Sequence, residues 1–350
     1  MKKKLLAILL VLTMVLGLAS CGSKDSGSGD ASLSAQIDKM SDMDADYAEL
    51  SIDVDTDLFK QSNLDITKLS LKIAAQTDKE SKKLGKAEIS YKLDSGDFTK
   101  LTTMIVDDQV IYINLKELKE AATGLIDKLG LSDYASVLTV LPSDEYVKID
   151  PATIAQMTGA EVSSSSLSIN EEDTKKIIKM VTEVTKAVED AIKDVEPAVI
   201  TGDDDKVAFN LSDKNAKATF EALAKADFSK CFDTVMEQME AIESFKAFAT
   251  EYKGKKSDIL AELKTTLEDG AKKLTDAKDF ALNYTFEISG SEGKRVAEQK
   301  FSVNVKDEEA SLKMSFTCSA QEGKEEKVEV PAEAADFMTI MSSLMGGMSY

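Results

Sequence analysis

The chain of 350 residues contains no histidine and no tryptophan, and Arg295 is its only arginine. Without histidine it cannot build a Ser-His-Asp triad, a Cys-His pair or a His-ligated metal site. A single arginine also leaves little capacity for bidentate binding of phosphate or carboxylate groups. These absences exclude the commonest forms of hydrolytic and metal-dependent catalysis.

Positive charge is scarce as well. The 43 Lys and Arg residues face 63 Asp and Glu residues, which gives a formal net charge of -20 at pH 7. Nucleic-acid binding needs a basic surface that neutralises phosphates, so the sequence predicts no nucleic-acid partner. The hydrophobic share of 43% is nevertheless that of a folded protein rather than a disordered one.

The first 20 residues have the three parts of a secretory signal peptide. Residues 2–4 are lysines, residues 5–16 are apolar, and Leu-Ala-Ser precedes Cys21. The apolar run is shorter than the roughly 20 residues of a membrane span. The Leu-Ala-Ser-Cys sequence resembles the lipobox of bacterial lipoproteins, and this resemblance implies cleavage before Cys21 and attachment of a diacylglyceryl group to its thiol. The alternative is an ordinary signal peptide with a cysteine beside its cleavage site.

The rest of the chain divides into a short tether and a large body. Residues 21–31 are mostly Gly, Ser and charged residues, so we expect a flexible, lipid-anchored tether. Two acyl chains anchor a protein stably, and the expected location is the extracytoplasmic face of the cell membrane. Residues 32–350 contain no Pro- or Gly-rich linker and no run of membrane-spanning length, so we expect a single domain.

Blocks of alternating polar and apolar residues predict antiparallel strands, joined as meanders. Strands are expected at 50–54, 69–73, 87–93, 101–106, 110–115, 146–149, 198–201, 207–211, 280–288, 301–305, 312–318 and 325–330. Elsewhere the apolar positions recur at helical spacing. Helices are expected at 116–129, 171–195, 214–225, 228–252, 257–274 and 332–344. Together they favour an α+β fold, with a curved antiparallel sheet of about 10–12 strands packed with several helices.

The order of these elements resembles the LolA/LppX superfamily of lipoprotein carriers. The matching pieces are the alternating strands, the hairpin around Asp107 and Asp108 that runs into a helix, and the later strand at 146–149. The resemblance implies that the sheet curls into a half-barrel around helices, with a hydrophobic cavity between them. The helical block at 214–275 departs from this pattern because it is longer.

On this resemblance, inward-facing residues of the C-terminal strands would line the cavity and hold a lipid-like apolar ligand. Period two places them on one face of the sheet. They are Phe280, Leu282, Tyr284, Phe286, Phe301, Val303, Leu312, Met314 and Phe316. The expected function is a membrane-anchored, non-enzymatic carrier. The alternative is a surface structural or interaction lipoprotein whose packed core holds no ligand, with an unidentified protein partner.

Other candidate chemistry is weaker. Asp42, Asp44 and Asp46 have the spacing of a calcium loop, but Tyr47 stands where that loop needs Gly, so we expect no metal site. A pair of carboxylates could hydrolyse glycosides without histidine, but no tryptophan is present to hold a sugar. The serines at 163–166 lack the spacing of a Ser-Lys nucleophile pair. We expect neither catalytic residues nor a cofactor.

Two features leave alternatives open. Cys231 and Cys318 fall on expected apolar faces, so they form either a disulfide or two free core thiols. Residues 337–350 are rich in methionine, and they form either a helix that closes the core or an adaptable lid over an apolar ligand.

Overall fold

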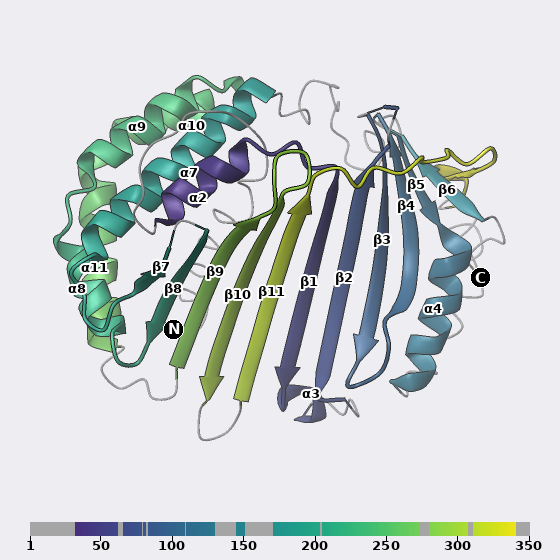
Figure 1. Cartoon of the computed structure of the whole chain (residues 1–350), viewed down its shortest axis with the longest axis horizontal. Coiled ribbons are helices and arrows are strands. Elements are labelled where there is room, and N and C mark those ends of the chain that lie inside the picture. The colour runs from purple at the N-terminus through teal and green to yellow at the C-terminus, as the bar shows by residue number, and fades with distance from the viewer. Residues whose placement is uncertain are drawn as a thin grey trace, which may run out of the picture. The chain divides into compact units, whose positions relative to one another are not determined.

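The computed structural model describes residues 32–61, 66–78, 80–81, 83–108, 110–129, 145–150, 171–203, 205–273, 280–306 and 311–340. The expected signal peptide, Cys21 and the tether lie outside these residues. Within them the fold is mixed α+β, with helices and a 12-stranded sheet whose strand order is open (Figure 1). The prediction of an α+β fold with a large, mainly antiparallel sheet is confirmed.

The chain forms two compact units. Unit 1 comprises Met1–Ala45, Ile169–Glu309 and Cys318–Glu322, and unit 2 comprises Asp46–Ser168, Ala310–Thr317 and Gly323–Tyr350. The single domain expected at 32–350 stays a prediction.

Unit 2 is built on an antiparallel meander of consecutive strands. Its strands are β1 (Tyr47–Thr56), β2 (Lys68–Thr77), β3 (Leu84–Leu93), β4 (Thr99–Asp107), β5 (Val110–Asn114), β6 (Tyr146–Ile149) and β12 (Ala335–Asp336), which pairs parallel to β6. Its helices are α3 (Leu58–Gln61) and α4 (Leu115–Lys128). α4 begins directly after β5 because the side chain of Asn114 accepts a hydrogen bond from the backbone N of Glu117 and caps the helix.

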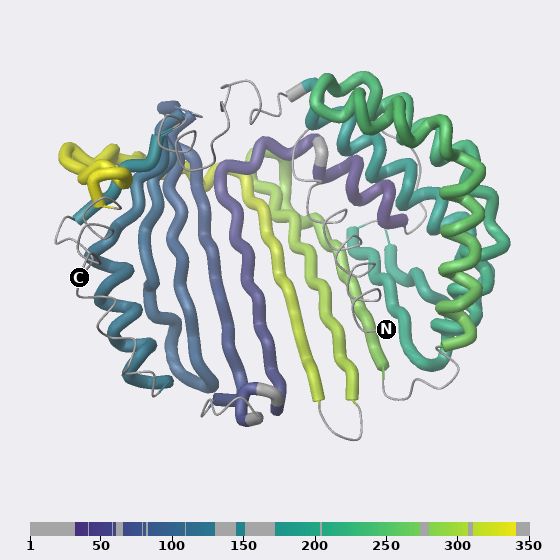
Figure 2. The backbone as a smooth tube through the Cα atoms, turned by 180° about the vertical axis from the view of Figure 1, so that it is seen from behind, coloured from purple at the N-terminus to yellow at the C-terminus, as the bar shows by residue number. Residues whose placement is uncertain are grey.

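Unit 1 combines short and long strands with a run of helices. Its strands are β7 (Ile200–Gly202), β8 (Lys206–Ser212), β9 (Phe280–Ser289) and β10 (Val296–Lys306). Its helices are α2 (Leu33–Ser41), α7 (Glu171–Ile192), α8 (Ala216–Lys225), α9 (Ser229–Glu240), α10 (Glu243–Lys253) and α11 (Lys256–Lys273). α2 lies against α7, β8 and β9, while α8 packs on α11 and α9 on α10 (Figure 2).

The last long strand, β11 (Ser311–Gln321), contributes residues to both units. The hydrogen-bonded order of the sheet is β12-β6-β5-β4-β3-β2-β1-β11-β10-β9-β8-β7. None of the described helices is long and apolar enough to cross a membrane.

Several sequence-based boundaries were wrong. The helix expected at 228–252 is divided into α9 and α10, because Ile242 between them is buried in an extended conformation. The strand expected at 325–330 is reduced to one isolated bridge between Glu326 and Asp78. The segment expected as a helix from 332 contains β12 first, and within the described part, which ends at 340, its helical residues are 337–340. Sequence analysis also missed α2, although Ser32 caps it and its apolar residues Leu33, Ile37 and Met40 recur at helical spacing.

Candidate functional site

The apolar stripe expected on the C-terminal strands is buried in unit 1. Phe286 has no exposed surface, and Tyr284 is 4% exposed. The strand register places Phe301 opposite Tyr284 and Val303 opposite Leu282. Directly opposite residues share a face of the sheet. The predicted common face is therefore present for this part of the set, while Phe280 is half-buried at the start of β9.

Helix α2 lies over the Phe286 end of this stripe. Its side chains Leu33, Ile37 and Met40 are all buried, and α2 lies against β8 and β9. The amide Nε2 of Gln299 lies 3.1 Å from the sulfur of Met40, and Gln299 is the register partner of Phe286. This part of the stripe therefore lies beneath a helix that the sequence analysis did not predict.

The remaining residues of the expected cavity belong to the other unit. Leu312, Met314 and Phe316 lie in the part of β11 that contributes to unit 2, and all three are half-buried. The nine residues that alternation assigned to one cavity are therefore shared between two compact units.

Unit 2 presents an apolar surface of its own on β1, β2 and β3, which we call the apolar floor. Its side chains share one face because each is the direct register partner of another. They form the rows Ala48-Ala75-Ala87, Leu50-Ile73-Ile89, Ile52-Leu71-Tyr91 and Val54-Leu69-Leu93. The same period-two signal that marked the C-terminal strands was present here, but sequence reasoning assigned the ligand elsewhere.

Most of the apolar floor is partly accessible rather than fully buried. Of its residues only Tyr91 is buried, Ala48 is exposed, and the others are partly accessible. α4 lies beside this floor against β4, and the hydroxyl of Tyr91 donates to the carbonyl oxygen of Ala121 at 3.4 Å. In both backbone views the described helices of unit 2 leave β1, β2 and β3 uncovered (Figures 1 and 2).

The opposite face of the same strands is charged. Lys72 forms an ion pair with Glu49 at 2.7 Å, and Tyr47 donates a hydrogen bond to Glu49. Burial, together with that hydrogen bond, raises the pKa of Tyr47 to about 12. Burial also opposes ionisation of Glu49, but the hydrogen bonds from Lys72 and Tyr47 outweigh it and lower the pKa of Glu49. The three strands therefore have one polar face and one apolar face.

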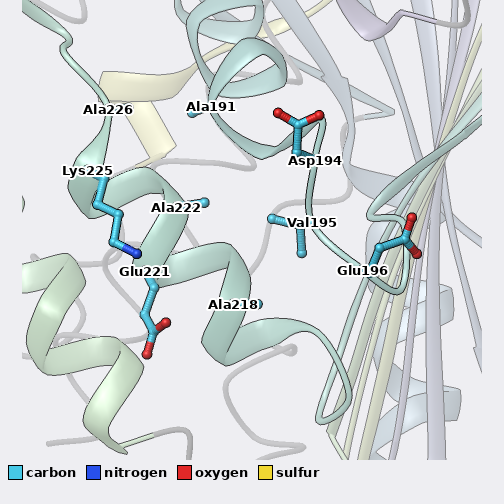
Figure 3. Close-up of a pocket in the computed structure, with 9 residues that line it drawn as sticks. All are labelled: Ala191, Asp194, Val195, Glu196, Ala218, Glu221, Ala222, Lys225 and Ala226. Carbon is cyan, nitrogen blue, oxygen red and sulfur yellow. The ribbon is translucent and has the colours of Figure 1, made fainter.

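A pocket of about 510 Å³ lies elsewhere, between the end of α7 and α8 in unit 1 (Figure 3). Its lining combines small apolar and charged residues, namely Ala191, Asp194, Val195, Glu196, Ala218, Glu221, Ala222, Lys225 and Ala226. The charged members are all exposed to solvent, and Glu221 and Lys225 extend side by side from α8. This depression shares no residue with the expected cavity.

The one arginine of the chain forms a structural clamp in unit 1. Arg295 donates to the carboxylate of Glu322 through Nη2 at 2.5 Å and through Nε at 3.1 Å. Glu322 also accepts from the backbone N of Asp44 and Gly293, and Arg295 donates to the carbonyl oxygen of Asp42 at 2.6 Å. The guanidinium holds the pKa of Glu322 down, at about 2. We call this arrangement the clamp; it fixes the segment that follows α2.

The acidic motif that was compared with a calcium loop serves the backbone instead. The carbonyl oxygen of Asp42 accepts a hydrogen bond from Arg295, and the backbone N of Asp44 donates one to Glu322. The carboxylate of buried Asp46 accepts from the backbone N of Gly323. In the described part of the chain, no group of three or more potential ligands could hold a metal ion. Cys231 and Cys318 are free thiols, and burial raises the pKa of each.

Comparison with known proteins gives no match, either to a protein-family model or to a curated protein.

Proposed function

We propose that this protein is an extracytoplasmic lipoprotein, anchored to the membrane through Cys21, that binds a lipid-like apolar ligand without catalysing a reaction. The observation that carries the proposal is the apolar floor of unit 2. A continuous apolar surface that stays accessible in a folded protein marks a binding site more often than chance exposure does.

The dimensions of the floor suit an acyl chain. Along the strands it covers the seven positions from Ala48 to Val54, which is about 20 Å at 3.3 Å per residue. One leaflet of a bilayer has a hydrocarbon thickness of about 15 Å, half of the roughly 30 Å core. A chain of that length fits along the strands. The net charge of -20 disfavours anionic lipids, so the ligand class is a neutral or zwitterionic lipid.

We further propose that the sheet curls as in the half-barrels of the LolA/LppX superfamily. The antiparallel meander of β1–β6 and the helix that directly follows β5 support this resemblance. In such a carrier the buried stripe of Phe280, Leu282, Tyr284, Phe286, Phe301 and Val303, with Leu312, Met314 and Phe316, would be a second apolar surface.

The second candidate is an interaction lipoprotein that has no ligand. It is favoured by the burial of Phe286, Tyr284 and Phe301 beneath α2, which is the packing of a solid core. In that case the apolar floor would receive a protein partner.

The test measures, by fluorescence, how tightly the chain from Gly22 onward binds a pyrene-labelled diacylglycerol. Ile73→Glu places a charge in the centre of the floor, and it should weaken binding at least tenfold, since a charge on an apolar surface must be desolvated by the ligand. The matched control is Ser51→Glu on the opposite face, where Ser51 is the register partner of Lys72.

The control should bind as the parent does, and both variants should keep the parent's far-ultraviolet circular dichroism. Failure of the parent to bind the probe, or equal binding by Ile73→Glu, would exclude the floor as a lipid site and leave the interaction lipoprotein.

A further inference from the structure

The N-terminal end of α2 is held by a single carboxylate of α7. Glu189 accepts hydrogen bonds from Ser34 Oγ at 2.7 Å, from Ser32 Oγ at 2.9 Å, and from the backbone N of Leu33 and Ser34. The first backbone N–H groups of a helix lack partners within the helix, and a carboxylate there also meets the positive end of the helix dipole. We call this arrangement the latch.

The other end of α2 is held much more firmly. The clamp fixes Asp42 and Asp44, immediately after the helix, through a buried ion pair in which the side chain of Glu322 is 4% exposed. The latch and the clamp thus differ in burial, because the carboxylate of Glu189 is partly accessible and that of Glu322 is not.

Without packing against the rest of unit 1, α2 would not stay helical. The helix has 9 residues, and helices this short are marginal in water without packing. Part of its contact with α7 is polar: besides the latch, Thr182 donates to Asp38 at 3.0 Å. Water can replace such hydrogen bonds when the helix leaves, whereas the apolar contacts of Leu33, Ile37 and Met40 must be replaced by another apolar group.

We propose that α2 is a strap that opens about the clamp when the latch is released, and that its opening uncovers the buried stripe of β8, β9 and β10. The movement is a local unfolding of one terminal element and leaves the rest of unit 1 folded. It holds whether or not the apolar floor of unit 2 binds lipid, so its failure and the failure of the proposed function are separate results.

The test uses the full chain with Cys21, Cys231 and Cys318 replaced by Ser, so that no other thiol can react, and with Val207→Cys as a reporter. Val207 has no exposed surface, is the register partner of Phe286, and lies in β8, which α2 contacts. A water-soluble maleimide should label this thiol slowly. Glu189→Ala should raise the labelling rate at least tenfold, and Glu189→Gln should give an intermediate rate because it keeps one acceptor oxygen.

The matched control is Glu172→Gln on the same helix, where an 80% exposed carboxylate pairs with Lys176. It should label as slowly as the reporter chain. Equal labelling of Glu189→Ala and the reporter chain would overturn the proposal.

A second measurement needs no variant. In hydrogen exchange of the full chain, the amides of residues 33–41 should exchange at least tenfold faster than those in the centres of β9 and β10. Exchange of α2 at the slow rate of those strands would show that it opens only in global unfolding, which contradicts a strap.

Discussion

Charged residues in this chain contribute to stability to different extents, depending on how far their side chains are buried. Lys255 and Glu251 lie one helical turn apart at 2.6 Å, but their side chains are 52% and 60% exposed. Exposed pairs of this kind contribute little to stability because water screens them. Arg295 and Glu322 are shielded, and Glu322 satisfies several backbone N–H groups as well. At the residue scale, stability therefore depends on the clamp far more than on the numerous surface pairs.

Glu322→Gln should destabilise the protein at pH 7 by about 3 kcal/mol. The folded-state pKa of about 2 lies below the ordinary 4.5, and each unit of difference corresponds to about 1.4 kcal/mol. Because the folded pKa is the lower one, this stabilisation is complete above pH 4.5 and is lost as the pH falls from 4.5 toward 2. Urea unfolding at several pH values measures it.

The parent and Glu322→Gln should therefore converge in stability toward pH 2. Glu329→Gln is the control, because Glu329 is 84% exposed and its nearest lysine nitrogen is 3.9 Å away. A difference between parent and Glu322→Gln that stays constant from pH 7 to pH 3 would contradict the assignment.

At the scale of elements, α8 and α11 approach each other closely because of one glycine. A Cβ built on Gly270 would lie 2.6 Å from Cδ1 and 2.8 Å from Cε1 of Phe220, so a side chain there must displace the ring. Gly270→Ala gains about 1 kcal/mol of helix propensity but overpacks the contact, at a cost of about 1–3 kcal/mol.

We expect Gly270→Ala to be destabilising by about 1 kcal/mol in chemical denaturation. Phe220→Leu should relieve the overlap, so the double variant should show a favourable coupling energy. A stabilising effect of Gly270→Ala alone would mean that the ring of Phe220 moves aside freely.

Truncating a side chain of the buried stripe should lower the free energy of unfolding more than truncating one of the apolar floor. Phe286→Ala removes a ring with no exposed surface and should cost about 3–5 kcal/mol. Ile73→Ala on the accessible floor should cost about 1–2 kcal/mol, since its side chain is already partly solvated. Equal penalties in urea unfolding would show that the floor is covered in solution.

The sequence was informative where one local rule decides the structure. Alternation located β9 to within one residue of its observed end, because each strand has one apolar and one polar face. Alternation could not show that the stripe is divided between two units, because the division depends on which strands pair with each other. The break at Ile242 involves neither Gly nor Pro, and the clamp joins residues more than 250 positions apart, so neither left a local signal.

At the scale of the whole molecule, the proposed anchor decides where the protein works. Cys21→Ser should abolish incorporation of a fatty-acid probe and leave the chain either unprocessed or released from the membrane, because the Cys21 thiol is the proposed acceptor. Metabolic labelling with an alkyne fatty acid, followed by membrane fractionation, measures both effects. Cys231→Ser is the matched control and should remain labelled and membrane-bound. Undiminished labelling of the Cys21→Ser chain would show that the anchor lies elsewhere.

The clamp also has a consequence for proteolysis. Because Arg295 is the only arginine, an arginine-specific protease has one bond to cleave in the entire chain, between Arg295 and Val296, where β10 begins. A protease needs an extended, accessible segment, whereas here the guanidinium and the adjoining backbone are bonded to Glu322. Cleavage would cut the chain between β9 and β10 and give one fragment that ends at Arg295 and one that begins at Val296. The appearance of these two fragments would therefore report directly how often the clamp opens, in a native chain without any label.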